Sequence, residues 1–226
     1  MLFLMLAPHN KPLNRLANPQ KLWIPYNNPD FPAYIKKGQL SSYPDFRAVS
    51  HWHDDLEFIV ILDGQMAYDI NGQKILLQTG EGIFVNSRCF HYGYSDTHAE
   101  CLFICILLSP QLLSVNTYFI QNYLDSLIQN SHFPYQKLNP SIQWQNTILH
   151  DLKILYENNI TKIQPFIILE KSVHIFRLLS ENMNFFPDYD KNTEDILALT
   201  AMIGYVQKKL SGKTSAERYF LCRKLL

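Results

Sequence analysis

Apolar residues in the first half of the chain come in short runs that are separated by turn residues. The run Leu56–Leu62 has the length of a strand and is rich in β-branched residues, and Asp63-Gly64 after it predicts that the strand ends there. Met66–Ile70 and Gln73–Leu77 flank Asn71-Gly72, a strong hairpin signal because both residues tolerate positive φ. Further predicted strands are Ile83–Val85, Tyr92–Tyr94 and Cys101–Leu108. Many short strands without a helical period between them predict a β-sandwich or β-barrel.

After Pro110 the apolar residues recur at intervals of three and four, the spacing of an amphipathic helix. The three predicted stripes are Ile120, Leu124 and Leu127; Ile148, Leu152 and Leu155; and Leu169, Val173 and Phe176. Residues 185–192 (FFPDYDKN) resemble a linker, and Thr193 to Leu210 is predicted as a further helix. The fold class predicted from this pattern is α+β: a β-barrel over residues 1–109, a helical region over 110–190, and a third segment over 191–226.

Composition is that of a globular protein: 47% of the 226 residues are apolar and 18% are charged. No apolar run approaches the roughly 20 residues that a membrane span needs. The apolar start of the chain lacks the basic region of a signal peptide, and its four cysteines form no CxxC pair. These features predict a reduced, cytoplasmic protein with no membrane segment.

The formal net charge is zero, but it is distributed unevenly. The segment from Ala201 to Leu226 contains six basic residues and a single acidic residue, Glu217. A basic end on an acidic body indicates contact with phosphate groups, although a solvated terminal helix would have the same charge pattern.

The segment HWHDDLEFIVILDG, residues 51–64, has the chemistry of a binding site. His51, His53 and Glu57 are all odd-numbered, so on a strand their side chains would point to one face. His91 could add a fourth group from a neighbouring strand. Three imidazoles and one carboxylate suit a divalent ion such as zinc, nickel, manganese or iron, or a polar ligand.

These residues resemble the two motifs of the cupins, which are small jelly-roll barrels. The first motif, G-x5-HxH-x3-E-x6-G, is matched by His51, His53, Glu57 and Gly64, with Asp45 in place of its first glycine. The second, G-x5-PxG-x2-H-x3-N, is matched by Gly80 and His91. The residues that depart from it are Asn86, Arg88 and Ser95, in place of the proline, the second glycine and the asparagine. The resemblance implies a cupin barrel with all four metal-binding positions of catalytic cupins retained.

A more specific resemblance, over roughly residues 20–220, is to the AraC/XylS family of bacterial transcription regulators. Their N-terminal domains commonly follow the pattern "HwHdelE…vl.G…y.i.g…l..G.gifi…..H", which residues 51–91 match closely. The family resemblance implies that residues 1–109 are an effector-binding barrel with an N-terminal arm (Met1–Tyr26). It also implies that residues 110–190 dimerise through helices, and that a sugar or related metabolite enters the barrel and changes how the arm or the helices meet the partner subunit and DNA.

The segment Met202–Tyr219 resembles the entry into the family's DNA-binding domain, which has two helix-turn-helix units. Only 25 residues remain from Met202, so we expect residues 191–226 to be the start of a truncated domain. We expect only weak phosphate contacts there, without sequence-specific DNA binding by this chain. The residues expected to make them are Lys208, Lys209, Lys213 and Arg218.

Three interpretations of the cluster His51, His53, Glu57 and His91 stay open: an effector pocket, a divalent metal site, and a structural polar cluster. Arg88 could reach an acidic effector, or it could be a solvated loop residue. The hypothesis favoured here is a regulator and not an enzyme. The alternative is a metal-dependent cupin enzyme, a dioxygenase or isomerase that uses the same four residues; the long helical region and the basic end weigh against it.

Overall fold

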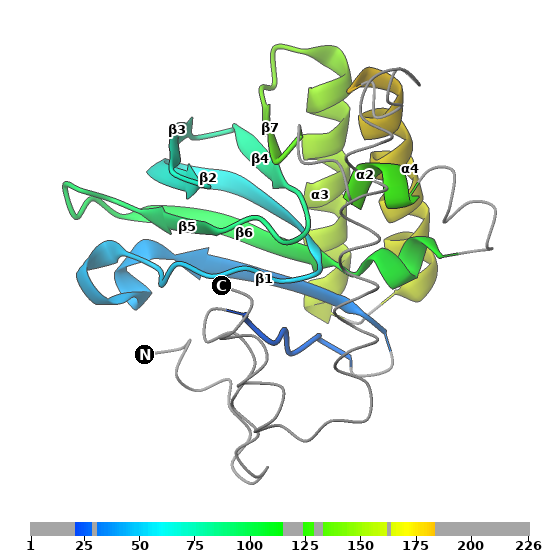
Figure 1. The fold of residues 1–226 in the computed structure, drawn as a ribbon, viewed down its shortest axis with the longest axis horizontal. Coiled ribbons are helices and arrows are strands. Elements are labelled where there is room, and N and C mark those ends of the chain that lie inside the picture. Colours follow the sequence, from blue (N-terminus) through cyan, green and yellow to red (C-terminus); the bar gives the residue numbers. More distant parts are fainter. Residues whose placement is uncertain (1–20, 29–30, 115–123, 129–132, 162–163, 184–226) are drawn as a thin grey trace, which may run out of the picture. The chain divides into compact units, whose positions relative to one another are not determined.

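The computed structural model describes residues 21–28, 31–114, 124–128, 133–161 and 164–183 (Figure 1). The strands are β1 (Ala33–Gln39), β2 (Leu56–Ile70), β3 (Gln73–Gln78), β4 (Gly82–Val85), β5 (His91–Tyr94), β6 (Cys101–Leu108) and β7 (Tyr135–Leu138). The helices are α2 (Asp125–Ile128), α3 (Gln143–Thr161) and α4 (Pro165–Asn182), with short 3-10 helices η1 (Leu40–Ser42), η2 (Pro44–Phe46) and η3 (Pro110–Leu113). The predicted linker, the segment 191–226 and its basic residues Lys208, Lys209, Lys213 and Arg218 lie outside the described residues.

The strands form an antiparallel barrel around the long strand β2. One sheet has the order β1-β6-β2-β4-β7, while β3 and β5 pair with the second half of β2. The prediction that a strand ends at Asp63-Gly64 is wrong, because β2 continues through both residues. Its register against β6 shifts between Ile61 and Asp63, and Gly64 adopts a φ of +81°. The irregularity lets one strand take part in both sheets, as β-bulges commonly do.

The hairpin predicted at Asn71-Gly72 is confirmed. Asn71 has a φ of +51° and Gly72 a φ of +85°, the signs that a two-residue hairpin turn requires at both positions. The turn joins β2 and β3 with Ile70 opposite Gln73.

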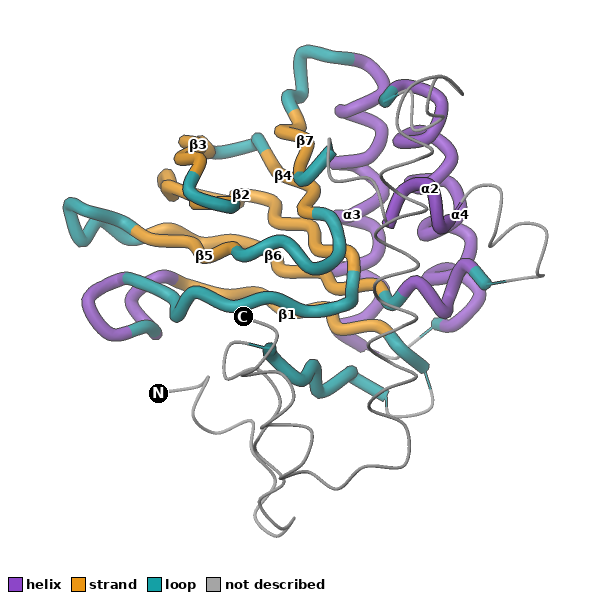
Figure 2. Tube along the Cα trace, viewed as in Figure 1, coloured by secondary structure: helices purple, strands orange, loops and turns teal. Residues whose placement is uncertain are grey.

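Alternate residues of the central strands serve two different cores. On β2, Phe58 and Val60 pack into a core shared with the helices, whereas Ile59 and Ile61 belong to a second core inside the barrel. Figures 1 and 2 show α3 and α4 together on one side of the sheet, so that side of the sheet is the one that they cover. The α+β class with an antiparallel barrel is confirmed.

The region after residue 110 contains the expected helices and also an unpredicted strand. β7 pairs with β4, with Gly82 opposite Leu138. The sheet therefore includes a strand from the region that was predicted to be helical. The stripe predicted on α4 lies on a helix, with Phe176 buried and Leu169 and Val173 37% and 41% exposed. Among the described helices, none has the length and apolar character of a membrane span.

Candidate ligand and metal site

His51, His53, Glu57 and His91 come together at one end of the barrel, as predicted. Their ligand atoms all lie within 4.8 Å of one another. They do not share one strand, however. Glu57 lies on β2, while His51 precedes it and forms a separate antiparallel bridge with His91, with backbone N···O distances of 3.2 and 2.9 Å. Shared odd numbering would align these side chains only on one continuous strand, so their convergence depends on this bridge instead.

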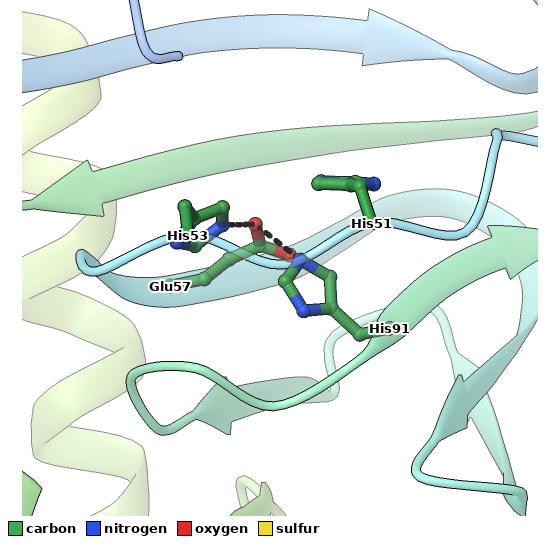
Figure 3. Close-up of side chains that lie close together, drawn as sticks. All are labelled: His51, His53, Glu57 and His91. Atoms are coloured by element: carbon green, nitrogen blue, oxygen red, sulfur yellow. Dashed lines mark hydrogen bonds and ion pairs between the residues drawn. The ribbon is translucent and has the colours of Figure 1, made fainter. Parts of the chain in front are cut away.

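The carboxylate of Glu57 is the centre of the cluster (Figure 3). Its Oε2 atom lies 3.1 Å from Nε2 of His53 and 3.2 Å from Nε2 of His91. Its Oε1 atom accepts a hydrogen bond from the hydroxyl of Tyr68. Glu57, His53 and His91 are at most 3% exposed, so these groups meet in a nearly water-free environment.

Each imidazole is oriented by a backbone carbonyl. Nδ1 of His51, His53 and His91 lies 2.8, 3.1 and 2.9 Å from a backbone oxygen. A carbonyl can only accept a hydrogen bond, so each Nδ1 carries the proton and each Nε2 is left for the interior. This is the arrangement in which histidines commonly bind metals, with the second nitrogen held by an outer partner.

Burial and mutual charge determine the protonation of the cluster. Burial and the neighbouring His91 lower the pKa of His51 to about 4, so this ring is neutral at pH 7. Burial raises the pKa of Glu57, but His91 and His53 outweigh it and hold the pKa well below its usual range. Burial lowers the pKa of His91, and the Glu57 charge outweighs it, leaving that pKa raised. The charge of the buried Glu57 carboxylate thus favours the protonated form of His91.

The donor set fits a divalent metal ion. Nε2 of His91 is buried, faces Glu57 and satisfies no hydrogen-bond geometry among the described residues, although it lies within ion-pair distance. Neutral imidazoles and a carboxylate would otherwise present only lone pairs to one another, so the cluster requires added protons or a cation. Three nitrogens and one carboxylate oxygen are a suitable ligand set for a first-row divalent metal.

Tyr68 is a member of the site that sequence reasoning missed. It is even-numbered, whereas Glu57 is odd-numbered, yet both side chains reach the same interior. The register shift between Ile61 and Asp63 explains this, because one extra residue reverses the alternation of side chains along β2. Gly64 and the even-numbered Met66, Tyr68 and Ile70 after it were the signals in the sequence that could have indicated the shift.

A cavity of about 570 Å³ adjoins the cluster, a volume within the usual range for small-molecule pockets. His51, Glu57 and Tyr68 line part of it. Apolar residues of β2, β6 and η1 line much of the rest, and β1 adds Tyr34, Lys36, Lys37, Gly38 and Gln39. The cavity has space for a ligand beside the cluster.

The segment 21–28 covers part of this cavity, and Leu22, Ile24 and Pro25 contribute to its wall. The backbone N–H of Leu22 donates to the carbonyl of Trp52 at 2.9 Å. Polar contacts fasten the segment at two further points: Lys21 Nζ lies 2.5 Å from Asp54 Oδ2, and the Tyr26 hydroxyl lies 2.8 Å from Asp55 Oδ1. The segment is therefore attached to the stretch of chain between His53 and Glu57.

The structure places Arg88 apart from the cavity. Its side chain is largely exposed and its Nε lies 2.8 Å from Asp54 Oδ1. It does not line the pocket, so the prediction that it reaches an effector receives no support from its position; the solvated loop residue is what the structure describes.

Comparison with known proteins agrees with this fold. Residues 38–107 match the model of the Cupin domain family. A relative in Bacillus subtilis (strain 168), described as the uncharacterized HTH-type transcriptional regulator YdeC, is 34% identical over 104 residues. That match covers 46% of this chain and about a third (35%) of the relative.

Solved structures show weaker likeness. A salicylate 1,2-dioxygenase from Pseudaminobacter salicylatoxidans has a TM-score of 0.31 at 22% identity, covering 33% of this chain and 21% of that chain. The plu4264 protein from Photorhabdus luminescens has a TM-score of 0.33 at 16% identity, covering 39% of this chain and 72% of that chain. Overlaps this partial carry no functional argument.

Proposed function

We propose that this chain is a transcription regulator of AraC type in which a small-molecule effector binds inside the cupin barrel. The observation that carries the proposal is the cavity of about 570 Å³, which has a polar cluster in its wall and a separate N-terminal segment across it. A ligand in this cavity would contact both the barrel and that segment. Similarity to the regulator YdeC over 104 residues supports the same function.

The N-terminal segment supplies a route from ligand to partner. Three of its residues line the cavity, and two others hold it to Asp54 and Asp55 by polar contacts. A ligand that packs against Leu22, Ile24 and Pro25 would stabilise this attached state over a released one. Such coupling is typically worth about 1–3 kcal/mol, which corresponds to a 5- to 150-fold change in affinity at a second site.

Helix α4 supplies a surface for the proposed homodimer. Phe166, Leu169 and Val173 are exposed at helical spacing, with Phe166 88% exposed. A stripe of this kind is better covered by a second copy than by water, and two-fold pairing is the commonest way to close such a contact.

The second candidate is a metal-dependent cupin enzyme, a dioxygenase or an isomerase. The observation that favours it is the complete ligand set of His51, His53, Glu57 and His91 beside a cavity. A metal held there would supply Lewis-acid or redox chemistry to a substrate. The residues of this chain would orient the ion and exclude water.

Two measurements test the proposed function. Deletion of the gene in its host is expected to change the transcripts of a small set of genes. Wild-type protein should restore them, and a variant with a filled cavity should leave them unresponsive to growth conditions that change the wild-type pattern. Elemental analysis of the purified chain provides the contrast. A full equivalent of iron or manganese, together with unchanged transcripts, would favour the enzyme.

A further inference from the structure

Buried apolar side chains form much of the inner wall of the cavity. Ile59 and Met66 of β2, Phe103 and Leu107 of β6, and Leu40 of η1 all line it, and each is at most 5% exposed. None of these side chains can hydrogen-bond a hydroxyl group. Any ligand that fills the cavity must place most of its surface against them.

The segment that covers the cavity has the same character. Its three lining residues are Leu22, Ile24 and Pro25, while its polar side chains Lys21 and Tyr26 are directed to Asp54 and Asp55. The segment therefore adds apolar surface to the cavity, while its polar side chains Lys21 and Tyr26 contact the barrel.

Polar groups line part of the wall. Glu57 and Tyr68 are buried, and they already satisfy each other. The second Glu57 oxygen faces His53 and His91. The other polar residues of the wall are the half-buried Tyr34, Tyr43, His51 and Cys105 and the exposed Lys36, Lys37, Gln39 and Ser42.

A sugar carries hydroxyl groups on nearly every carbon atom, and each would need a partner when it leaves water. Apart from the buried Glu57 end and the exposed residues, the wall offers only Tyr34, Tyr43 and Cys105, fewer partners than a sugar has hydroxyl groups. An apolar molecule, in contrast, gains from burial against the same wall in proportion to its area.

We infer that the ligand of this cavity is a compact, largely apolar molecule, aromatic or branched aliphatic, with a single polar group placed toward the Glu57–Tyr68 end. This inference rests on the proposed function, because it takes the cavity to be the effector site. It disagrees with the sugar implied by the family resemblance. The reason is the predominantly apolar wall to which both halves of β2, β6, η1 and the N-terminal segment contribute.

Calorimetric titration of the full chain with matched probes tests this ligand class. The probes are 4-tert-butylphenol, tert-butylbenzene, which lacks the polar group, and the sugars D-xylose and D-glucose. We expect 4-tert-butylphenol to bind at least tenfold more tightly than tert-butylbenzene. We expect a negative heat-capacity change on binding, the mark of apolar burial, and no heat from millimolar sugar.

Two cavity variants locate the binding. Leu107→Phe fills buried wall, and Leu102→Phe enlarges a side chain in a partly exposed part of the wall. Each is expected to weaken phenol binding at least tenfold. Leu76→Phe, the same change at a residue of β3 that is 47% exposed, should leave it unchanged. Thermal unfolding of each variant checks that the fold is kept.

The outcomes separate this inference from the proposed function. Sugar binding without phenol binding would overturn the ligand class and leave effector sensing intact. Phenol binding that neither cavity variant weakens would place the probe elsewhere and overturn the ligand class. Binding by none of the probes would contradict the ligand class, and the transcript measurement would still decide the sensing function.

Discussion

Two residues that depart from the cupin motifs keep the backbone conformation that the motifs imply. Asp45 and Arg88 stand where the motifs have glycine, and they have φ values of +52° and +62°. Glycine occupies such positions without cost, whereas a residue with a Cβ atom is strained there. The substitutions therefore changed the side chains and left the turns in place, and this explains why the four cluster residues still meet.

Replacing Arg88 tests this strain. Arg88→Gly and Arg88→Ala both remove the ion pair with Asp54, but only glycine relaxes the left-handed backbone. We expect the glycine variant to be more stable than the alanine variant by about 1 kcal/mol, in line with the cost of this conformation. Urea unfolding of the two variants measures the difference. Equal midpoints would show that position 88 is not strained.

The buried cluster predicts a metal-dependent stability. After treatment with a chelator, adding Mn²⁺, Ni²⁺ or Zn²⁺ should raise the melting temperature. A ligand at a hundredfold excess over its Kd stabilises the folded state by about 2.7 kcal/mol. Glu57→Gln removes the only carboxylate of the cluster and should abolish most of the rise. Protons compete with the metal for the ring nitrogens, so the rise should shrink as the pH falls.

Glu170→Gln is the matched control for this measurement, because Glu170 lies on α4 with a largely exposed side chain, outside the cluster. It should keep the full metal response. An equal response in both variants would contradict a metal site at Glu57.

At the scale of elements, the fold depends on β2 staying continuous through Gly64. A Cβ atom at Gly64 would lie 2.4 Å from the carbonyl oxygen of Glu100, so no larger residue fits without moving β6. The same position lies next to the register shift that brings Tyr68 to the side of Glu57. The crowded backbone at Gly64 thus lies beside the irregularity that decides whether Tyr68 reaches the site.

Alanine substitutions at two glycines separate crowding from strain. Gly72 has a φ of +85° with no heavy atom within 4 Å of an added Cβ, so Gly72→Ala should cost only the backbone strain of about 1 kcal/mol. Gly64→Ala adds the clash with Glu100, and we expect a total cost of about 2 kcal/mol or more. Denaturant unfolding measures both. Equal losses would mean that β6 adjusts without penalty.

At the scale of the whole molecule, the exposed stripe on α4 predicts self-association. Phe166→Asp places a charge in the proposed dimer contact, where it would be desolvated without a partner. We expect the wild-type chain to be a dimer in light scattering at tens of micromolar and the variant to be a monomer. Val49→Asp is the control, because Val49 is 74% exposed and lies outside α4. A monomeric wild-type chain would contradict the proposal.

Much of the local structure followed from the sequence. Alternation and turn residues located β3 to β6 and the Asn71-Gly72 hairpin, because strand period and positive φ are local properties. The spacing HxHxxxE, with His91 farther along, identified the cluster, because it matches the two cupin motifs. The helical period also located α3 and α4.

Tertiary structure decided the features that depend on distant partners. β7 is a four-residue strand that exists because β4 offers an edge, and nothing in its own sequence distinguished it from a loop. The buried face of α4 is set by α3 and η3, and Leu169 and Val173 remain partly exposed. Tyr68 joined the site through a register shift, and the apolar character of the cavity appeared only when β2, β6, η1 and the N-terminal segment met around it. A single sequence records which residues are apolar, but only the folded chain determines which of them share a wall.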